Sequence, residues 1–273
     1  YGLQDELDQL YGIIPDEDGS IFILQSISTS EGRFTLRKLN SSGEILWTKQ
    51  HLQEIGGSPD GMIRTSDGGF ILNGTVYVPP YYDPEYPVHM IRNAVVKTDS
   101  LGNEEWVSIY RWEEDNIDTV FMSVGGGVQE FDAHSYNVVT HSRNNSNLSP
   151  IMYELNVDGD LLWHKEFANP DTAYADLQSV IVNDSIILVA LAVAQPIDLY
   201  GIKRLQVYKM DIYGNKLDQY VDQVRTGILS DFRLTKDSSS VFIMPSARYQ
   251  NSTYSLYALK LNSYTMELDS FAL

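Results

Sequence analysis

Four acidic residues of this chain have the type and the placement that hydrolytic chemistry needs. Asp60, Glu130, Asp176 and Asp231 each fall in a segment that we expect to form the innermost strand of a sheet. Two carboxyl groups about 5 to 9.5 Å apart can cleave a glycosidic bond. The sequence does not show which of the four would pair, and among 37 acidic residues some convergence is expected by chance. A glycoside hydrolase is therefore an alternative hypothesis for this chain, not the first.

Metal and nucleophile chemistry have less support. Asp16 to Gly19 and Asn156 to Asp160 place oxygens at alternate positions around a glycine, as calcium loops do. Equivalent turns elsewhere in the chain have no acid at the position of Asp158; they have Ser42, Leu101, Tyr213 and Tyr264 there. A plain turn is therefore the better interpretation. The histidines show no spacing typical of metal ligands, and no nucleophile elbow or Walker-type phosphate loop is present. We predict no metal, no cofactor and no catalytic residue, and an enzyme is the less favoured interpretation.

Aromatic residues that could bind a ligand cluster in the segment Tyr77 to His89. Four prolines stiffen it, and Tyr81, Tyr82 and Tyr86 offer flat amphipathic rings. Such rings can stack on sugars or anchor a protein partner. Packing of these rings over the fold as a structural cover is an equally open alternative.

A second candidate lies in the segment Tyr110 to Asp118, where Trp112 stands beside Glu113 and two further acids. An aromatic ring next to carboxylates could hold a sugar or a cation, although a solvated acidic loop with a buried Trp also explains it. Two further pairs are expected in corresponding loops on the same rim: Tyr200 with Arg204, and Arg248 with Tyr249.

The elements that must position these residues come from a repeat of ten residues. Each copy has a strand, a turn and a second strand, and in four of the five copies the turn has Asn or Asp followed three residues later by Gly. The five copies run from Lys38 to Trp47, Lys97 to Trp106, Glu154 to Trp163, Lys209 to Asp218 and Lys260 to Asp269. A second hairpin precedes each copy, so the sequence predicts four strands per unit and five units.

Units of this kind cannot bury both faces alone and must stack on their neighbours. Four strands per unit and a period of this length predict an all-β, five-bladed β-propeller of four-stranded antiparallel blades. We expect one domain, residues 1-273, with blades near 11-52, 60-112, 119-168, 177-222 and 230-273. Trp47, Trp106 and Trp163 should fill the wedge between adjacent blades, and Asp218 and Asp269 at that position require another filling. The simplest expectation is five complete blades that close without a strand exchange between the termini. The alternative is that residues 1-10 add a strand to the last blade, although their leucine spacing fits a short helical turn equally well.

A family resemblance supports this fold. Thr65 to Gly74 (TSDGGFILNG) followed by Val95 to Trp106 (VVKTDSLGNEEW) resembles the repeats of secreted and surface-anchored β-propeller proteins of Bacteroidetes. The resemblance covers nearly the whole chain, strongly in units one to three and weakly in four and five. It implies an exported propeller, often a lipoprotein, of mostly unassigned function, and carries over no catalytic residue.

The composition limits which classes of partner and which cellular locations we expect. A net charge of -18 over 273 residues repels phosphate backbones, so we expect no nucleic acid as partner. The longest apolar run, Ile186 to Ala194, is about half of what a membrane-spanning helix requires. The chain has no cysteine, which excludes disulfides and is compatible with bacterial export. We therefore expect an extracellular, periplasmic or surface-anchored protein without a membrane-spanning segment of its own, whose oligomeric state the sequence does not indicate.

The favoured hypothesis is a propeller that binds a glycan or a protein through its long-loop face without catalysis. Its candidate ligand-binding residues are Tyr81, Tyr82, Tyr86, Trp112, Glu113, Tyr200, Arg204 and Tyr249. The alternatives are a glycoside hydrolase with paired carboxylates near the propeller axis, and a structural subunit of an envelope assembly that would expose apolar patches on its blade edges.

Overall fold

A computed structural model describes most of the chain. It covers residues 9-26, 33-78, 90-110, 127-132, 134-144, 147-166, 173-183, 185-194, 203-226, 229-235, 237-248, 254-256 and 258-272. These residues belong to two compact units, the first made of 1-137 with 154-162 and the second of 138-153 with 163-273.

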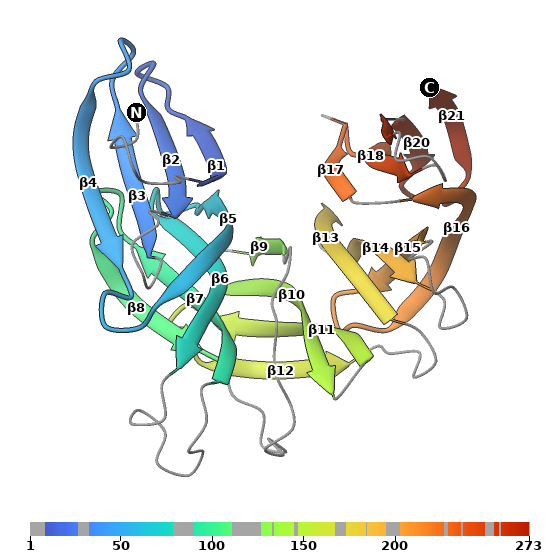
Figure 1. The fold of residues 1–273 in the computed structure, drawn as a ribbon, viewed down its shortest axis with the longest axis horizontal. Coiled ribbons are helices and arrows are strands. Elements are labelled where there is room, and N and C mark those ends of the chain that lie inside the picture. Colours follow the sequence, from blue (N-terminus) through green and yellow to red (C-terminus); the bar gives the residue numbers. More distant parts are fainter. Residues whose placement is uncertain are drawn as a thin grey trace. The chain divides into compact units, whose positions relative to one another are not determined.

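The described residues form five sheets, built from β-strands without a helix, which we call blades 1 to 5 in chain order (Figure 1). In each blade consecutive strands are neighbours, and the pairings that the structure describes are antiparallel. Blade 1 contains β1 (Gln9–Pro15), β2 (Ile21–Ser26), β3 (Phe34–Leu39) and β4 (Ile45–His51). Blade 2 contains β5 (Gly57–Arg64), β6 (Phe70–Val78), β7 (Met90–Thr98) and β8 (Glu104–Ile109). Blade 3 contains β9 (Gly127–Asp132), β10 (Ser135–Asn144), β11 (Asn147–Asn156) and β12 (Leu161–Glu166).

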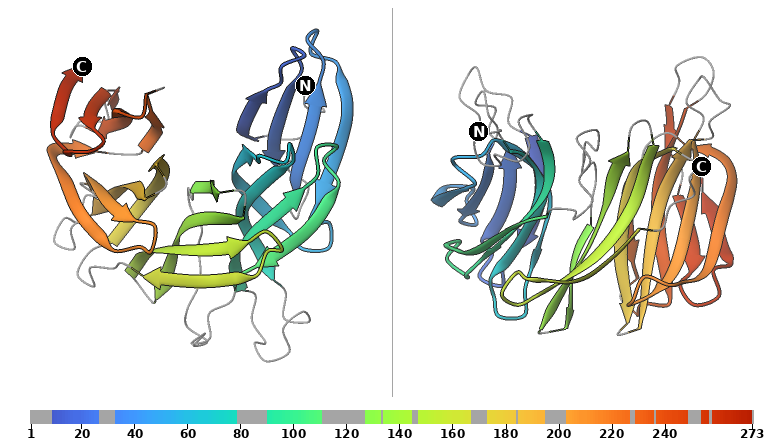
Figure 2. Two further views of the ribbon diagram at one scale, coloured as in Figure 1. Left: turned by 180° about the vertical axis from the view of Figure 1, so that it is seen from behind. Right: turned by 90° about the horizontal axis from the view of Figure 1, so that it is seen from below.

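Blades 4 and 5 complete the series, so the prediction of five four-stranded units is confirmed. Blade 4 contains β13 (Ala173–Asn183), β14 (Ile186–Ala194), β15 (Lys203–Asp211) and β16 (Lys216–Thr226). Blade 5 contains β17 (Leu229–Leu234), β18 (Ser240–Arg248), β19 (Tyr254–Leu256), β20 (Ala258–Asn262) and β21 (Leu268–Ala272). Both β19 and β20 pair with β18, so the third strand of blade 5 is in two pieces. Figure 2 shows the strands of each blade side by side from two further directions.

The predicted turn chemistry is confirmed in the first four copies of the repeat. Each Asx oxygen accepts two backbone N–H groups across its turn; Asp99 Oδ1, for example, accepts from Leu101 and Asn103, both at 2.8 Å. The glycine of each turn has a positive φ, a conformation that only glycine adopts without strain. The values are 82° at Gly43, 76° at Gly102, 84° at Gly159 and 72° at Gly214.

The fifth copy differs from its expected alignment. Its turn is one residue longer, because Asn262 N–H donates to Glu267, whereas Asn40 N–H donates to Glu44. Lys260 therefore pairs with Ser270, while Lys38 pairs with Trp47, so Ser270 and not Asp269 takes the position of the tryptophan. The alignment of the fifth copy to a ten-residue repeat missed this insertion, because no glycine marks its turn.

Tryptophan rings lie against the next blade's turn, as predicted. A Cβ placed on Gly102 would lie 2.8 Å from Trp47 Cη2, and one on Gly159 would lie 2.7 Å from Trp106 Cε3. Trp106 also donates its indole N–H to Val157 O at 2.7 Å. In blade 4, Asp218 does take the tryptophan position opposite Lys209. Met266, 5 % exposed in the turn of blade 5, packs into a core cluster formed by residues of blades 4 and 5.

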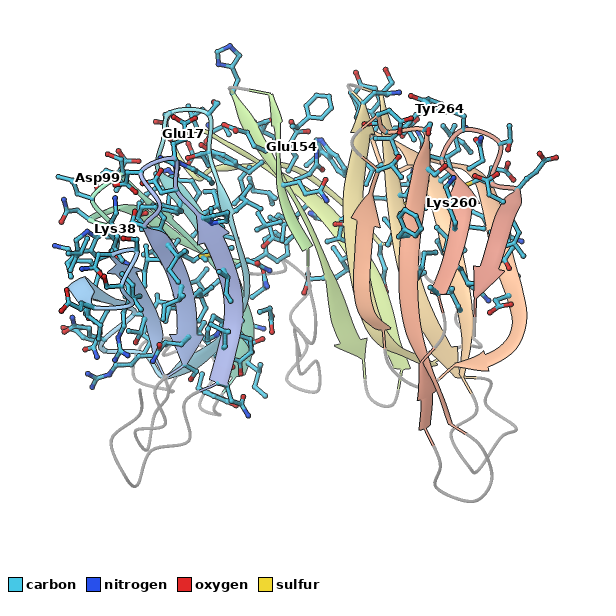
Figure 3. All side chains as sticks on the ribbon, turned by 90° about the horizontal axis from the view of Figure 1, so that it is seen from above. Glu17, Lys38, Asp99, Glu154, Lys260 and Tyr264 are labelled. Atoms are coloured by element: carbon cyan, nitrogen blue, oxygen red, sulfur yellow. The ribbon has the colours of Figure 1, made fainter. Side chains whose placement is uncertain are left out.

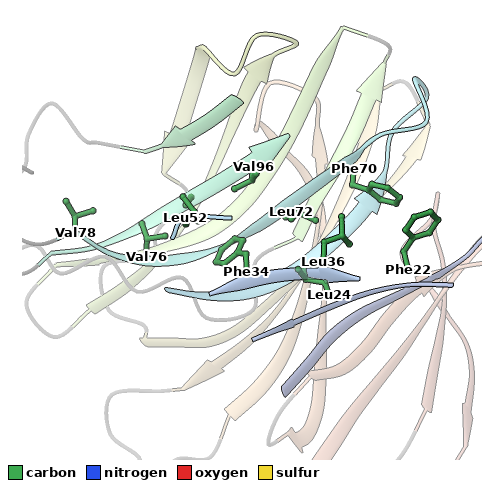
Figure 4. Close-up of a cluster of buried hydrophobic side chains, with 11 residues drawn as sticks. Phe22, Leu24, Phe34, Leu36, Leu52, Phe70, Leu72, Val76, Val78 and Val96 are labelled. Atoms are coloured by element: carbon green, nitrogen blue, oxygen red, sulfur yellow. The ribbon is translucent and has the colours of Figure 1, made fainter. Parts of the chain in front are cut away.

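The core of the first unit lies between blades 1 and 2. Phe22 and Leu24 on β2 and Phe34 and Leu36 on β3 pack against Phe70 and its neighbours on β6 (Figure 4). In the second unit the long apolar run is strand β14, whose residues from Ile187 to Leu191 are at most 1 % exposed. Both faces of this strand are covered, which is why its sequence does not alternate between apolar and polar residues. Among the described residues, no helix has the length and apolar character to span a bilayer.

Candidate functional site

Each blade presents two ends. The turns between its first and second strands and between its third and fourth strands lie at one end, which we call the turn end. The connection between its second and third strands lies at the opposite end, the loop end. Figure 3 labels Glu17 and Asp99, which belong to turns of blades 1 and 2.

At the loop end of blade 2, strands β6 and β7 pair without a break from Phe70 with Thr98 to Val78 with Met90. The segment 79-89 therefore starts and finishes at a hydrogen-bonded strand pair. Tyr77, the residue before the last pair on β6, is 50 % exposed and donates its backbone N–H to Gly56 O at 2.7 Å. The backbone of Tyr77 is thus fixed next to the start of this segment, and its side chain is half exposed.

The base of this loop end is rigid. Val76 and Val78 belong to the core of the first unit. The Asn93 amide on β7 is 4 % exposed and donates to Gly74 O at 3.0 Å, and Tyr110 N–H donates to Asn93 O at 2.9 Å. Strands that are mostly buried and bonded in this way give a well-packed platform, the usual support for a binding loop.

Most of the predicted ligand-binding residues lie outside the described residues: Tyr81, Tyr82, Tyr86, Trp112, Glu113, Tyr200 and Tyr249. Arg204 is described only as part of a strand. It lies in β15, paired with Val193 and Arg225, and not in the loop where we expected it. Strand β15 begins at Lys203, so Arg204 falls inside the strand and not in the loop before it.

Charged side chains at the turn end are bound to each other. Lys97 on β7 is 3 % exposed, and its Nζ lies 2.7 Å from Asp67 and 2.9 Å from Glu105. Lys38 makes the corresponding contact in blade 1, at 3.0 Å from Asp16. The first lysine of the repeat therefore ties the upstream turn to its blade. We did not predict this role, although the pattern of an acid in the upstream turn and a lysine opening the repeat was visible in blades 1 and 2.

These contacts change the acidity of the groups. Burial alone would raise the pKa of the Asp67 carboxyl, but hydrogen bonds from Lys97, Thr65 and Gly69 outweigh it and lower the pKa to about 2. Burial would also lower the pKa of Lys97, but the two carboxylates beside it raise that pKa above its usual value. Hydrogen bonds from Arg64 and Lys38 hold the pKa of Asp16 well below its usual value. All three groups are charged at neutral pH.

Asp67→Asn should therefore destabilise the protein in a pH-dependent way. A folded pKa below the unfolded value of about 3.9 contributes stability that is present above about pH 4 and is lost as the pH falls toward 2. The difference in urea midpoint between wild type and variant should be largest near neutral pH and should shrink between about pH 4 and 2.5. The control Glu17→Gln removes an exposed carboxylate in the turn of blade 1. A difference for Asp67→Asn that stays constant across this range would contradict the ion pair.

Turns are also tied across blades. Arg64, at the end of β5, lies 2.7 Å from Asp16 in the first turn of blade 1. Glu130 on β9 accepts from Ser66 N–H at 2.7 Å and from the Ser66 hydroxyl at 2.8 Å, in the first turn of blade 2. The carboxylate of Glu130, which we considered as a catalytic group, is thus bonded to the neighbouring turn.

The other inner-strand acids lie at irregularities. The pairing of β5 with β6 shifts between Pro59 and Gly61, so Asp60 is the extra residue of a β-bulge. Asp176 on β13 and Asp231 on β17 directly follow similar shifts. Strands β13 and β17 contact each other, as do β1 with β5 and β5 with β9, which places the first strands of neighbouring blades next to one another.

Comparison with known proteins rests on structure alone. No protein-family model matches this chain, and no curated protein matches it by sequence. A protein of unknown function from Dyadobacter fermentans superposes with a TM-score of 0.70 at 10 % identity, covering 100 % of this chain and 84 % of that one. The Hadza microbial sialidase Hz136 superposes with a TM-score of 0.60 at 8 % identity, covering 97 % of this chain and 58 % of that one.

The fold is a five-bladed β-propeller. At these identities the likeness shows the fold and nothing of the chemistry. A Synechocystis apocarotenoid oxygenase matches with a TM-score of 0.55 at 9 % identity, covering 93 % of this chain and 58 % of its own. One scaffold thus recurs in proteins of different named activity, so function has to be argued from the propeller's own residues.

Within the described part of the propeller, no group of three or more His, Asp or Glu side chains is arranged to hold a metal ion. The turn at Asp16 uses that carboxylate for Lys38 and Arg64, which supports the interpretation as a plain turn. His51, which the sequence did not single out, is 4 % exposed, with Nδ1 3.4 Å from Glu104 Oε2. Burial lowers its pKa, although the hydrogen bond to the Glu104 carboxylate opposes this. It bridges the outer strands β4 and β8.

Proposed function

We propose that this propeller is an exported, non-catalytic binding protein whose ligand, a glycan or a protein, contacts the loop end of blade 2. The observation that carries the proposal is the unbroken pairing of β6 and β7 up to Val78 and Met90, with Tyr77 half exposed beside it. The segment that this pair presents contains Tyr81, Tyr82 and Tyr86 among four prolines. Stiff tyrosines on a rigid base lose little entropy on binding.

The turn end supports the proposal indirectly. Its lysines and acids hold strands and turns together: Lys97 binds Asp67 and Glu105, and Glu130 binds the turn of the neighbouring blade. Side chains engaged in this way are poor catalytic groups, because releasing them from their partners costs folding energy. Binding is therefore assigned to the opposite end.

Export and surface attachment are part of the proposal. They rest on the likeness of the repeat to those of Bacteroidetes surface propellers, on the absence of cysteine and on the net charge of -18. The fold match to a Dyadobacter protein is compatible with this origin. We infer no nucleic-acid partner, because the charge opposes one.

A glycoside hydrolase is the second candidate. Its support is the position of Asp60, Asp176 and Asp231 at or beside bulges of the first strands, since bulges often re-aim side chains next to active sites. The sialidase among the fold matches is compatible with it. Release of reducing sugar from a bound polysaccharide would favour this candidate over a binding protein.

A structural subunit of an envelope assembly is the third candidate. Apolar side chains are exposed on outer strands, namely Leu46 at 55 %, Leu162 at 54 % and Leu217 at 55 %. However, the pairing shifts at Leu46 and at Leu217 place bulges in β4 and β16. Bulges blunt an edge against the addition of another strand. These residues therefore favour side-chain contacts with a partner over strand pairing.

The test is binding of the purified chain to a glycan array and to insoluble polysaccharides, beside a Tyr81→Ala/Tyr82→Ala/Tyr86→Ala variant. The matched control is Tyr213→Ala/Tyr264→Ala, which removes tyrosines that are 64 % and 46 % exposed at the turn end. We expect loss of binding in the first variant and full binding in the second. Equal binding by all three proteins would refute the loop-end site. Absence of binding to any glycan would exclude a glycan as the ligand and leave a protein.

A further inference from the structure

The chain contains five sites where Asp or Asn precedes Gly. They are Asp18, Asp60, Asp67, Asn73 and Asp158. At such a pair the backbone nitrogen of the glycine can attack the side-chain carbonyl carbon, because no side chain on the glycine shields that nitrogen. Structure decides which of the five pairs can react.

Two of the pairs lie inside paired strands. Gly61 pairs with Asn73, and Gly74 pairs with Pro59, within the β5 and β6 ladder. Asn73 is 0 % exposed. The backbone of these pairs cannot turn toward the side chain without breaking the sheet, so both are protected.

The other three pairs lie in turns with the same backbone. Gly19, Gly68 and Gly159 have φ values of 79°, 87° and 84°, and each donates its N–H to the residue three positions before it. Solvent reaches all three turns. The backbone therefore does not distinguish them, and the difference must come from the carboxylates.

Two of the three carboxylates are held in place. Asp18 accepts from Ser20 N–H at 2.8 Å and from the Ser20 hydroxyl, and lies 3.5 Å from Lys38. Asp67 accepts from Gly69 N–H at 2.9 Å and from the Thr65 hydroxyl, and pairs with Lys97. A carboxylate must leave these partners before its carbon can be attacked.

The carboxylate of Asp158 has no hydrogen-bond or ion-pair partner within the part of the chain that the structure describes, and the residue is exposed. We propose that Asp158–Gly159 is a modification site at which aspartate converts to isoaspartate. Gly159 N forms a bond to Asp158 Cγ, the N–H proton and the carboxyl hydroxyl leave as water, and a succinimide results. Water then adds to the imide and opens it at the α-carbonyl, which leaves the chain running through the side-chain methylene.

The modification would disturb the contact between Trp106 of blade 2 and the turn of blade 3. Gly159 lies against the Trp106 ring, which also donates to Val157 O at 2.7 Å. Isoaspartate adds one methylene to the backbone between these two contacts, so the turn can no longer hold both. The product also carries a free α-carboxylate, the group that methyltransferases specific for isoaspartate esterify with S-adenosylmethionine.

The test is incubation of the folded chain at mildly acidic pH, followed by peptide mapping and by methyl transfer from S-adenosylmethionine with an isoaspartyl methyltransferase. Because the other two carboxylates must first break charge-assisted hydrogen bonds, we expect at least about tenfold more isoaspartate at Asp158 than at Asp18 or Asp67. Asp158→Ser, which copies Ser42 of blade 1, should remove this signal and keep the turn.

A second variant tests the protection itself. Ser20→Ala removes one donor to Asp18 and should raise isoaspartate at that residue while leaving the amount at Asp158 unchanged. Equal modification at the three turns of the folded wild type would overturn the proposal. So would its absence at Asp158 in the folded chain when the denatured chain forms it readily.

Discussion

Gly102→Ala should lower the free energy of unfolding by about 2 to 5 kcal/mol, whereas Gly43→Ala at the same position of the repeat should cost only about 1 to 2 kcal/mol. Both glycines have a positive φ, 76° and 82°, so both substitutions carry backbone strain. A Cβ at Gly43 meets nothing within 4 Å, but a Cβ at Gly102 lies 2.8 Å from Trp47. Urea denaturation of the two variants separates the strain from the clash with the ring.

A double-mutant cycle identifies the clash. In a Trp47→Ala background, Gly102→Ala should cost no more than Gly43→Ala, because the ring it would meet is gone. Equal costs for the two glycine variants in the wild-type background would show that Trp47 does not lie against this turn in solution.

Phe22→Ala should cost about 3 to 5 kcal/mol of stability. Its side chain is 2 % exposed, and its ring lies 4.6 Å from that of Phe70 and 5.9 Å from that of Trp47, measured between ring centroids. Truncation leaves a cavity between blades 1 and 2 and also removes the face over which Lys38 lies at 4.9 Å. Thermal and urea unfolding measure the loss.

The control for this variant is Leu101→Ala, at a position that is 63 % exposed in a turn of blade 2. It should change stability by no more than about 0.5 kcal/mol. Phe22→Leu should fall between the two, since it keeps part of the volume. A loss for Phe22→Ala no larger than that of Leu101→Ala would contradict the core between blades 1 and 2.

The features predicted correctly from sequence were those that a short stretch of chain determines. An Asx oxygen and a glycine three residues later fold a turn without help from the rest of the molecule, so the turns at Asp99 and Asp211 could be predicted. Four such turns and a fifth Asx turn without the glycine, each between apolar runs, were enough to count the blades. The packing of the tryptophans was also predicted, because a large ring that recurs at one position of the first three blades must pack on the next blade.

Features that depend on contacts between distant residues were missed. The extra residue in the fifth turn is visible in the hydrogen bond of Asn262 to Glu267 and in the pairing of Lys260 with Ser270, and not in the sequence. The hydrogen bond from Ser66 to Glu130 joins residues 64 positions apart, so no local pattern could distinguish Glu130 from an acid facing the axis. The candidate ligand-binding tyrosines belong to segments that no repeat constrains, and the prediction for them stays a prediction.

Hydrogen–deuterium exchange is the most direct test of the division between a structural turn end and a binding loop end. The purified chain would be measured with and without a saturating amount of a glycan that the array identifies. We predict slower exchange at the loop end of blade 2, around Val78 and Met90, and unchanged exchange in the turns at Asp99 and Asp211. Protection confined to those turns, with none at the ends of β6 and β7, would contradict the account.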